Sequence, residues 1–90
     1  MISKDVTFRD RYGLHPRAAM RIQQEAARFA AAVTVRGPGS SSPVAASSMI
    51  SLVSAGIRQG DSVHLTADGT DESAALEAVG RLMEAGVCHP

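Results

Sequence analysis

The residues of this chain best suited to group-transfer chemistry are a histidine and an arginine that flank a proline, His15-Pro16-Arg17. They precede an alanine-rich run, so the histidine is expected to lie where a helix begins. Proline favours the first helical position, because its fixed φ suits the helix and its missing N–H would have no partner there. The unpaired N–H groups and partial positive charge of a helix N-terminus attract anions. The pattern indicates a histidine that handles phosphate, and the alternative is a surface histidine that merely caps a helix.

The other residues that could bind a metal ion or a phosphate do not form a recognisable binding motif. His64 falls in mid-strand on the expected outward face, where a solvated side chain is the simpler interpretation. Cys88 and His89 lie in the C-terminal tail, and two residues fall short of the three or four ligands that a metal site needs. The glycines of residues 37–43 match no phosphate-binding loop and lead into no lysine. We therefore expect neither a metal site nor a cofactor.

Length and composition predict one small globular domain over residues 1–90. Hydrophobic residues make up 44% and charged residues 20%, which is typical of a folded rather than a disordered chain. No apolar run is long enough to cross a membrane, and residues 1–5 lack the apolar run of a signal peptide. The single cysteine cannot form an internal disulfide, so a reducing cytoplasm is the expected compartment.

Charge is balanced overall but unevenly distributed. The net charge of zero gives no indication of nucleic-acid binding. Residues 1–45 hold seven of the nine basic residues and three of the nine acidic ones. Four of these basic residues lie near His15 in the sequence: Arg9, Arg11, Arg17 and Arg21. They predict a docking face for acidic partners, where complementary charge speeds encounter, or else a solvated basic surface.

The pattern of apolar residues predicts four short strands and three helices. Alternation between apolar and polar residues predicts strands over residues 2–9, 33–36 and 62–67. Val44-Ala45 can form only a short strand, which Pro43 marks as an edge. Spacings of three and four predict helices over residues 16 to about 32, 47–55 and 71 to about 85. The expected N-caps of the second and third helices are Ser47 or Ser48, and Thr70. Gly56 and Gly86 are the expected stops.

These elements follow the order β-α-β-β-α-β-α, without an internal repeat. The core stripes expected in the two longer helices are Ala19, Ile22 and Ala26, and Leu76, Val79 and Met83. Glu77 and Arg81 are expected to form an ion pair one helical turn apart. Amphipathic helices must bury one face, so the economical arrangement is an α+β fold of two layers, in which one sheet carries all the helices on one face.

Three blocks of the sequence resemble the HPr family, the histidine-containing phosphocarriers of the bacterial phosphoenolpyruvate:sugar phosphotransferase system. The active-site motif of the family is Gly-Leu-His-x-Arg-Pro-Ala, and here it reads Gly13-Leu14-His15-Pro16-Arg17-Ala18-Ala19. The second block, Ala46-Ser47-Ser48-Met49-Ile50-Ser51-Leu52, is similar to the family's stretch around a regulatory serine. The third comprises residues 56–61 and 67–72. The blocks lie at family-like spacings, and the resemblance covers nearly all 90 residues.

The resemblance implies an HPr-like open-faced β-sandwich, a four-stranded antiparallel sheet of order 1-4-2-3 with three helices on one face. It implies that His15 accepts a phosphoryl group on Nδ1 from phosphorylated enzyme I, itself charged by phosphoenolpyruvate, and passes it to a histidine of an enzyme IIA. Arg17 would stabilise the phosphate with its charge, and the backbone N–H groups of Arg17 and Ala18 would bind it. Such a protein is a phosphotransfer intermediate rather than a turnover enzyme.

Two positions depart from the family motif. The family's proline is replaced by Ala18, and a proline stands instead at position 16, where it removes one N–H from the phosphate site. The departure keeps open a specialised family member that serves a nitrogen-regulatory or dihydroxyacetone-kinase chain. A non-catalytic regulatory module of the same fold is a further alternative, although the presence of both His15 and Arg17 counts against it.

Ser48 stands where an HPr kinase phosphorylates some family members, and the alternative is that it only caps a helix. A phosphate would add about −1.5 to −2 charges and disfavour docking of enzyme I. The expected partner-docking surface consists of Met49, Leu52, Val53, Met20 and Arg21, unless Met49 and Ile50 are core residues. We expect a monomer that meets enzyme I, enzyme IIA proteins and, where one exists, an HPr kinase.

Overall fold

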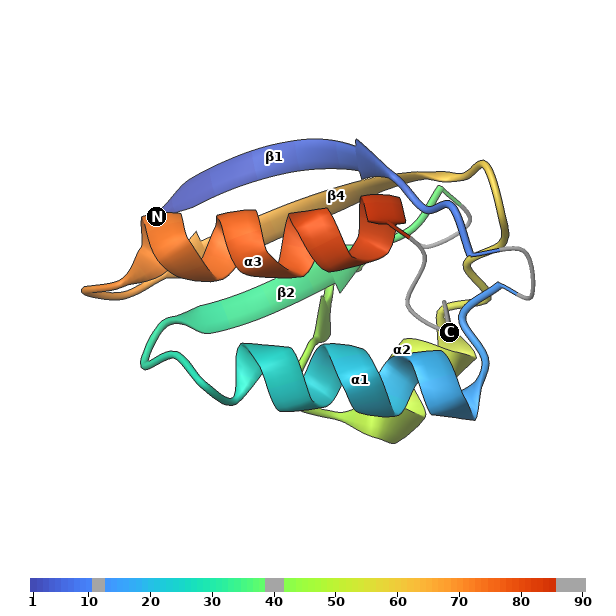
Figure 1. Ribbon diagram of the computed structural model, residues 1–90, viewed down its shortest axis with the longest axis horizontal. Helices are drawn as coiled ribbons and strands as arrows, with labels where there is room; N and C mark the ends of the chain where they lie inside the picture. The colour runs from blue at the N-terminus through green and yellow to red at the C-terminus, as the bar shows by residue number, and fades with distance from the viewer. Residues whose placement is uncertain (11–12, 39–41, 86–90) are drawn as a thin grey trace.

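The strands form one antiparallel sheet (Figure 1). The computed structural model describes residues 1–10, 13–38 and 42–85. The strands are β1 (Ile2–Thr7), β2 (Ala32–Arg36), β3 (Val44–Ala45) and β4 (Ser62–Asp68). Their order across the sheet is β1-β4-β2-β3, with all pairs antiparallel. The predicted strand order and the α+β architecture are therefore confirmed.

The helices are α1 (Pro16–Ala26), α2 (Met49–Ser54) and α3 (Glu72–Ala85). α1 and α3 lie side by side over one face of the sheet, and α2 packs against α1 beside β3 (Figure 1). The largest fully buried side chains between the layers are Phe8, Ile22, Leu52, Leu65, Met83, Val35, Val63 and Val79. The opposite face of the sheet is polar, and no described helix covers it. No helix within the described ranges has the length and apolarity to cross a bilayer.

The first helix ends at Ala26, well before the predicted end near Ala32. The N–H groups of Ala30 and Ala31 donate to the carboxylate of Asp71 at 2.9 and 2.8 Å, and Ala32 already belongs to β2. Because these long-range partners take the place of helical carbonyls, they override the high helix propensity of the alanine run.

Two smaller boundaries also differ from the prediction. β1 ends at Thr7 rather than at residue 9, because the N–H of Phe8 donates to the carbonyl of Asp61 in the turn before β4 (2.9 Å). The N-cap predicted at Thr70 is one residue too early, since α3 begins at Glu72. Both differences arise from long-range contacts or local turn geometry that apolar periodicity does not report.

The predicted boundaries of α2 and the predicted ion pair on α3 agree with the structure. Ser48 is the N-cap of α2, which decides between the two candidate serines. Gly56 follows the end of α2 with a φ of +68°, a conformation that glycine adopts without steric cost. Glu77 and Arg81 form the predicted ion pair on α3, at 2.6 Å. The predicted stop at Gly86 lies outside the described residues.

Candidate functional site

His15 is the N-cap of α1. Its backbone is extended (φ −85°, ψ 173°), and its Nδ1 accepts a hydrogen bond from the N–H of Ala18 at 3.4 Å. Its carbonyl accepts from the N–H of Ala19 at 2.9 Å. Pro16 follows as the first helical residue, as predicted. An accepting ring nitrogen must carry its lone pair, so Nδ1 presents a lone pair at the helix N-terminus.

Backbone contacts with a distant segment fix the loop before His15. The buried Leu14 donates its N–H to the carbonyl of Ile57 at 2.9 Å. Gly13 has a φ of +73°, and a Cβ on it would lie 3.1 Å from the same carbonyl. Both the positive φ and the close approach of this carbonyl favour glycine at this position. Arg11 and Tyr12, which precede Gly13, lie outside the described residues.

The first turn of α1 offers two backbone donors and one cation. The N–H of Arg17 has no partner within the helix, and the N–H of Ala18 faces the imidazole. The guanidinium of Arg17 is exposed and forms no ion pair with a described residue. Pro16 contributes no donor. The arrangement can hold an anion at the end of the helix, directly beside a nucleophilic nitrogen.

The predicted docking surface is only partly at the surface. Met20 (45% exposed) and Arg21 face solvent on α1, and Val53 is half-buried on α2. Leu52 is fully buried, so its assignment to this surface was wrong: it packs in the core beneath α2. The side chain of Met49 lies outside what the structure describes.

Ile50 is an exposed apolar residue of α2 that the prediction of the docking surface missed. It is 78% exposed, so its interpretation as a core residue was also wrong. Successive helical residues differ by about 100°, so two residues two positions apart point in nearly opposite directions. Burial of Leu52 therefore turns Ile50 outward, and the spacing of the two residues places Ile50 at the surface once Leu52 is known to be buried.

Ser48 uses its hydroxyl within the first turn of α2. The oxygen accepts from the N–H of Ser51 at 3.3 Å, and the hydroxyl donates to the Oγ of Ser51 at 3.0 Å. One residue earlier, the carbonyl of Ser47 accepts from Nε2 of Gln23 on α1 at 3.0 Å. The predicted cap is confirmed, and the start of α2 is tied to the helix that carries His15.

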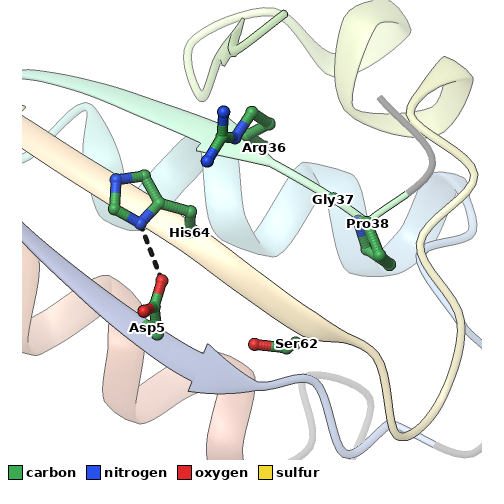
Figure 2. Close-up of a pocket in the computed structure, with 6 residues that line it drawn as sticks. All are labelled: Asp5, Arg36, Gly37, Pro38, Ser62 and His64. Atoms are coloured by element: carbon green, nitrogen blue, oxygen red, sulfur yellow. Dashed lines mark hydrogen bonds and ion pairs between the residues drawn. The ribbon is translucent and has the colours of Figure 1, made fainter. Parts of the chain in front are cut away.

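A hollow of about 420 Å³ lies on the uncovered face of the sheet, and the loop and helix around His15 contribute nothing to it (Figure 2). Its lining residues are Asp5, Arg36, Gly37, Pro38, Ser62 and His64. Nδ1 of His64 lies 2.7 Å from Oδ1 of Asp5, which confirms the outward placement of this histidine. Within the described ranges, no three His, Cys, Asp or Glu side chains are grouped as metal ligands would be, and Cys88 and His89 lie outside those ranges.

Comparison with known proteins identifies the family of this chain. A family model described as the PTS HPr component phosphorylation site matches residues 2–85. The chain therefore belongs to the HPr family of the phosphotransferase system.

Individual relatives agree with that assignment. The chain is 38% identical over 77 residues to the phosphocarrier protein HPr of Haemophilus influenzae, covering 86% of this chain and 88% of that protein. The crystal structure of HPr-C-His from Thermoanaerobacter tengcongensis is similar with a TM-score of 0.85 at 32% identity, covering 94% of this chain and 93% of that one. A multiphosphoryl transfer protein of Haemophilus influenzae is 29% identical over 82 residues, but the chain spans only 16% of its length.

Proposed function

We propose that this chain is a phosphocarrier of the phosphotransferase system. His15 accepts a phosphoryl group from phosphorylated enzyme I, which obtains it from phosphoenolpyruvate, and passes it to a histidine of an enzyme IIA in sugar uptake. The observation that carries the proposal is the position of His15 Nδ1, 3.4 Å from the N–H of Ala18 at the start of α1. A nucleophilic lone pair and an anion-binding helix end are thereby brought to one point.

The transfer is a displacement at phosphorus. The lone pair of Nδ1 forms a new N–P bond while the bond from phosphorus to the donor histidine breaks, and the donor nitrogen keeps that electron pair. The bond from Ala18 to Nδ1 must open first, and its 3.4 Å length is beyond the usual range for a strong hydrogen bond. After transfer, the N–H groups of Ala18 and Arg17 can donate to phosphoryl oxygens, so the helix end serves both states.

Arg17 supplies the charge that the two backbone donors lack. Its guanidinium is exposed at the second position of α1 and can reach a phosphoryl group on His15, two residues earlier. An exposed cation stabilises the phosphate without burying it. The phosphohistidine stays accessible to the next acceptor, as a carrier requires.

Phosphorylation of the purified chain tests the proposal. The protein is incubated with enzyme I from its own source organism and phosphoenolpyruvate, and acid-labile phosphate on histidine is measured by mass spectrometry and by acid treatment. We expect label on His15 in the native chain and none in His15→Ala. Stable absence of label with a cognate enzyme I would exclude the phosphocarrier function and leave a non-catalytic module of the same fold.

The departure from the family motif at Pro16 and Ala18 leads us to propose a second candidate, a specialised carrier for a nitrogen-regulatory or dihydroxyacetone-kinase chain. Pro16 occupies the first helical position and leaves the phosphate site with one N–H fewer than another residue would provide. The labelled chain is offered to acceptors from the sugar, nitrogen-regulatory and dihydroxyacetone-kinase branches, and the rates of phosphate loss are compared. Preference for a sugar-branch enzyme IIA supports the general carrier, whereas preference for either other branch supports the specialised one.

We also propose that Ser48 is a regulatory phosphorylation site. Its hydroxyl lies at the start of α2, one residue after the carbonyl that Gln23 ties to α1. A phosphate there places negative charge next to the apolar docking residues and repels an acidic partner. Phosphoryl transfer from enzyme I is compared for Ser48→Asp and Ser48→Asn. Equal rates would count against regulation through charge.

A carrier that presents one surface to donor and acceptor in turn needs no second subunit. We therefore propose that the protein acts as a cytoplasmic monomer. Light scattering of the purified chain, before and after phosphorylation, measures its molar mass. The mass of a dimer in either state would contradict this part of the proposal.

A further inference from the structure

Arg58 lies beside the His15 loop, although the two are far apart in the sequence. Leu14, which precedes His15, donates its N–H to the carbonyl of Ile57, which precedes Arg58 (2.9 Å). A Cβ on Gly13 would also lie 3.7 Å from Cα of Arg58. The backbone of Arg58 is therefore in contact with the loop that delivers the histidine.

A tight turn fixes the position of Arg58. Its N–H donates to the carboxylate of Asp61 at 2.8 Å, and its carbonyl accepts from the N–H of Asp61 at 3.1 Å. Gly60 has a φ of +89° and donates its N–H to the carbonyl of Phe8 at 2.7 Å. These bonds anchor the turn to the end of β1, so the Arg58 backbone is held relative to both the sheet and His15.

The side chain of Arg58 is exposed, and no acidic group in the described part of the chain forms an ion pair with it. Arg17 and Arg21 on α1 are likewise exposed and unpaired within that part of the chain. Two separate segments that meet at the His15 loop, α1 and the turn before β4, thus contribute a cluster of exposed arginines that form no ion pair with a described residue. Such a cluster is complementary to an acidic surface and accelerates encounter with it.

We propose that Arg58 is a docking residue that meets an acidic side chain of the phosphoryl donor and speeds its approach to His15. The inference rests on the proposed phosphocarrier function and adds a contact from the turn before β4. Arg58 contacts the partner and not the phosphoryl group. Its loss therefore lowers the rate of encounter and leaves the rate of transfer within the bound complex unchanged.

Transfer from phosphorylated enzyme I is measured for the native chain, Arg58→Gln, Arg58→Lys and the matched control Arg36→Gln. Arg36 is also an exposed arginine without an ion pair to any described residue, but it lies on the uncovered face of the sheet. At low ionic strength we expect Arg58→Gln to lower the second-order rate constant about three- to tenfold. The difference should largely vanish at about 0.5 M salt, where screening shortens electrostatic reach. Arg58→Lys should retain most of the rate, and Arg36→Gln all of it.

Three results would overturn the inference. If Arg58→Gln transfers as fast as Arg36→Gln, Arg58 does not take part in docking. If instead the rate at saturating donor falls, Arg58 acts within the complex and the docking role is wrong. If the native chain takes no label at all, the phosphocarrier function fails and the inference falls with it. Labelling of the native chain thus separates failure of the docking role from failure of the function.

Discussion

The carboxylate of Asp71 accepts a hydrogen bond from the backbone N–H of Ala31 at 2.8 Å, and so joins the start of α3 to the connection between α1 and β2. Its other oxygen accepts from the N–H of Ala30 at 2.9 Å. The bond from Ala30 is the largest of the effects that hold the pKa of this carboxyl below its ordinary value of 3.8. Burial, the next largest effect, opposes this shift, and the bond from Ala31 adds to it. The ionised form is thus favoured by folding.

A carboxyl whose pKa is lower in the folded state stabilises the fold above its unfolded pKa. That stability is lost as the pH falls through the folded pKa. We therefore expect Asp71→Asn to be less stable than the native chain at pH 7 and to lose less stability on acidification below about pH 4. Urea denaturation at several pH values measures this, with the exposed Glu84→Gln as control. The same acid dependence in Asp71→Asn and in the native chain would contradict the prediction.

Leu52 and Ile50 provide a matched pair on one helix. Leu52 is fully buried, so Leu52→Ala should destabilise the chain by about 2–5 kcal/mol through lost burial and a cavity. Ile50 is 78% exposed, and Ile50→Ala should change stability by less than about 0.5 kcal/mol. Ile50→Ala should instead weaken binding of phosphorylated enzyme I. Chemical denaturation and titration with enzyme I separate the two effects, and a large stability loss in Ile50→Ala would show that the residue is not at the surface.

The cap at Ser48 can be separated from any regulatory role. Ser48→Ala removes the side-chain acceptor for the N–H of Ser51 and should cost about 0.5–2 kcal/mol. Ser48→Asp keeps an acceptor, so its stability should stay close to that of the native chain. Thermal unfolding measures both, and Ser47→Ala, which leaves the backbone carbonyl in place, is the control. If Ser48→Ala is no less stable than Ser47→Ala, the hydroxyl does not stabilise α2.

Pro16→Ala tests what the proline at the helix start contributes. The fold should lose about 0.4–1 kcal/mol, because the unfolded chain gains freedom when proline is removed. The new N–H can donate to a phosphoryl oxygen, so phosphohistidine at position 15 should hydrolyse more slowly than in the native chain. Urea denaturation and the decay of label at neutral pH measure the two effects. Equal or faster decay would mean that this donor does not reach the phosphate.

Much of the fold could be predicted from local pattern. Alternation located β1, β2 and β4, because one face of each packs toward the helices while the other faces solvent. The end of α1 could not be predicted in this way, since the groups that terminate it, Ala30 and Ala31, are bound by Asp71 from a distant part of the chain. The proximity of Arg58 to His15 has the same origin, a backbone contact between remote loops.

The residues at the start of α1 could be predicted from the sequence, whereas the exposed residues of α2 could be predicted only in part. His15, Pro16 and Arg17 are adjacent in the sequence, so their positions at the helix start follow from local rules. The apolar residues of α2 are only partly decided by such rules. A six-residue helix is too short for periodicity to distinguish its inner from its outer face, and packing of Leu52 against the core makes that choice.

The weak cap at the start of α1 links folding to the energetics of exchange. Under the proposed function, the nitrogen that caps the start of α1 in the unphosphorylated protein is also the atom that carries the phosphoryl group. Whatever stabilisation the phosphoryl group gains from the helix end is subtracted from its group-transfer potential. Because the cap bond is 3.4 Å long, little stabilisation of the helix is lost when the phosphoryl group replaces it. Pro16 leaves one N–H fewer to hydrogen-bond the phosphoryl group. The helix end is thus suited to a nearly isoenergetic hand-over, in which direction is set by the relative amounts of charged donor and free acceptor.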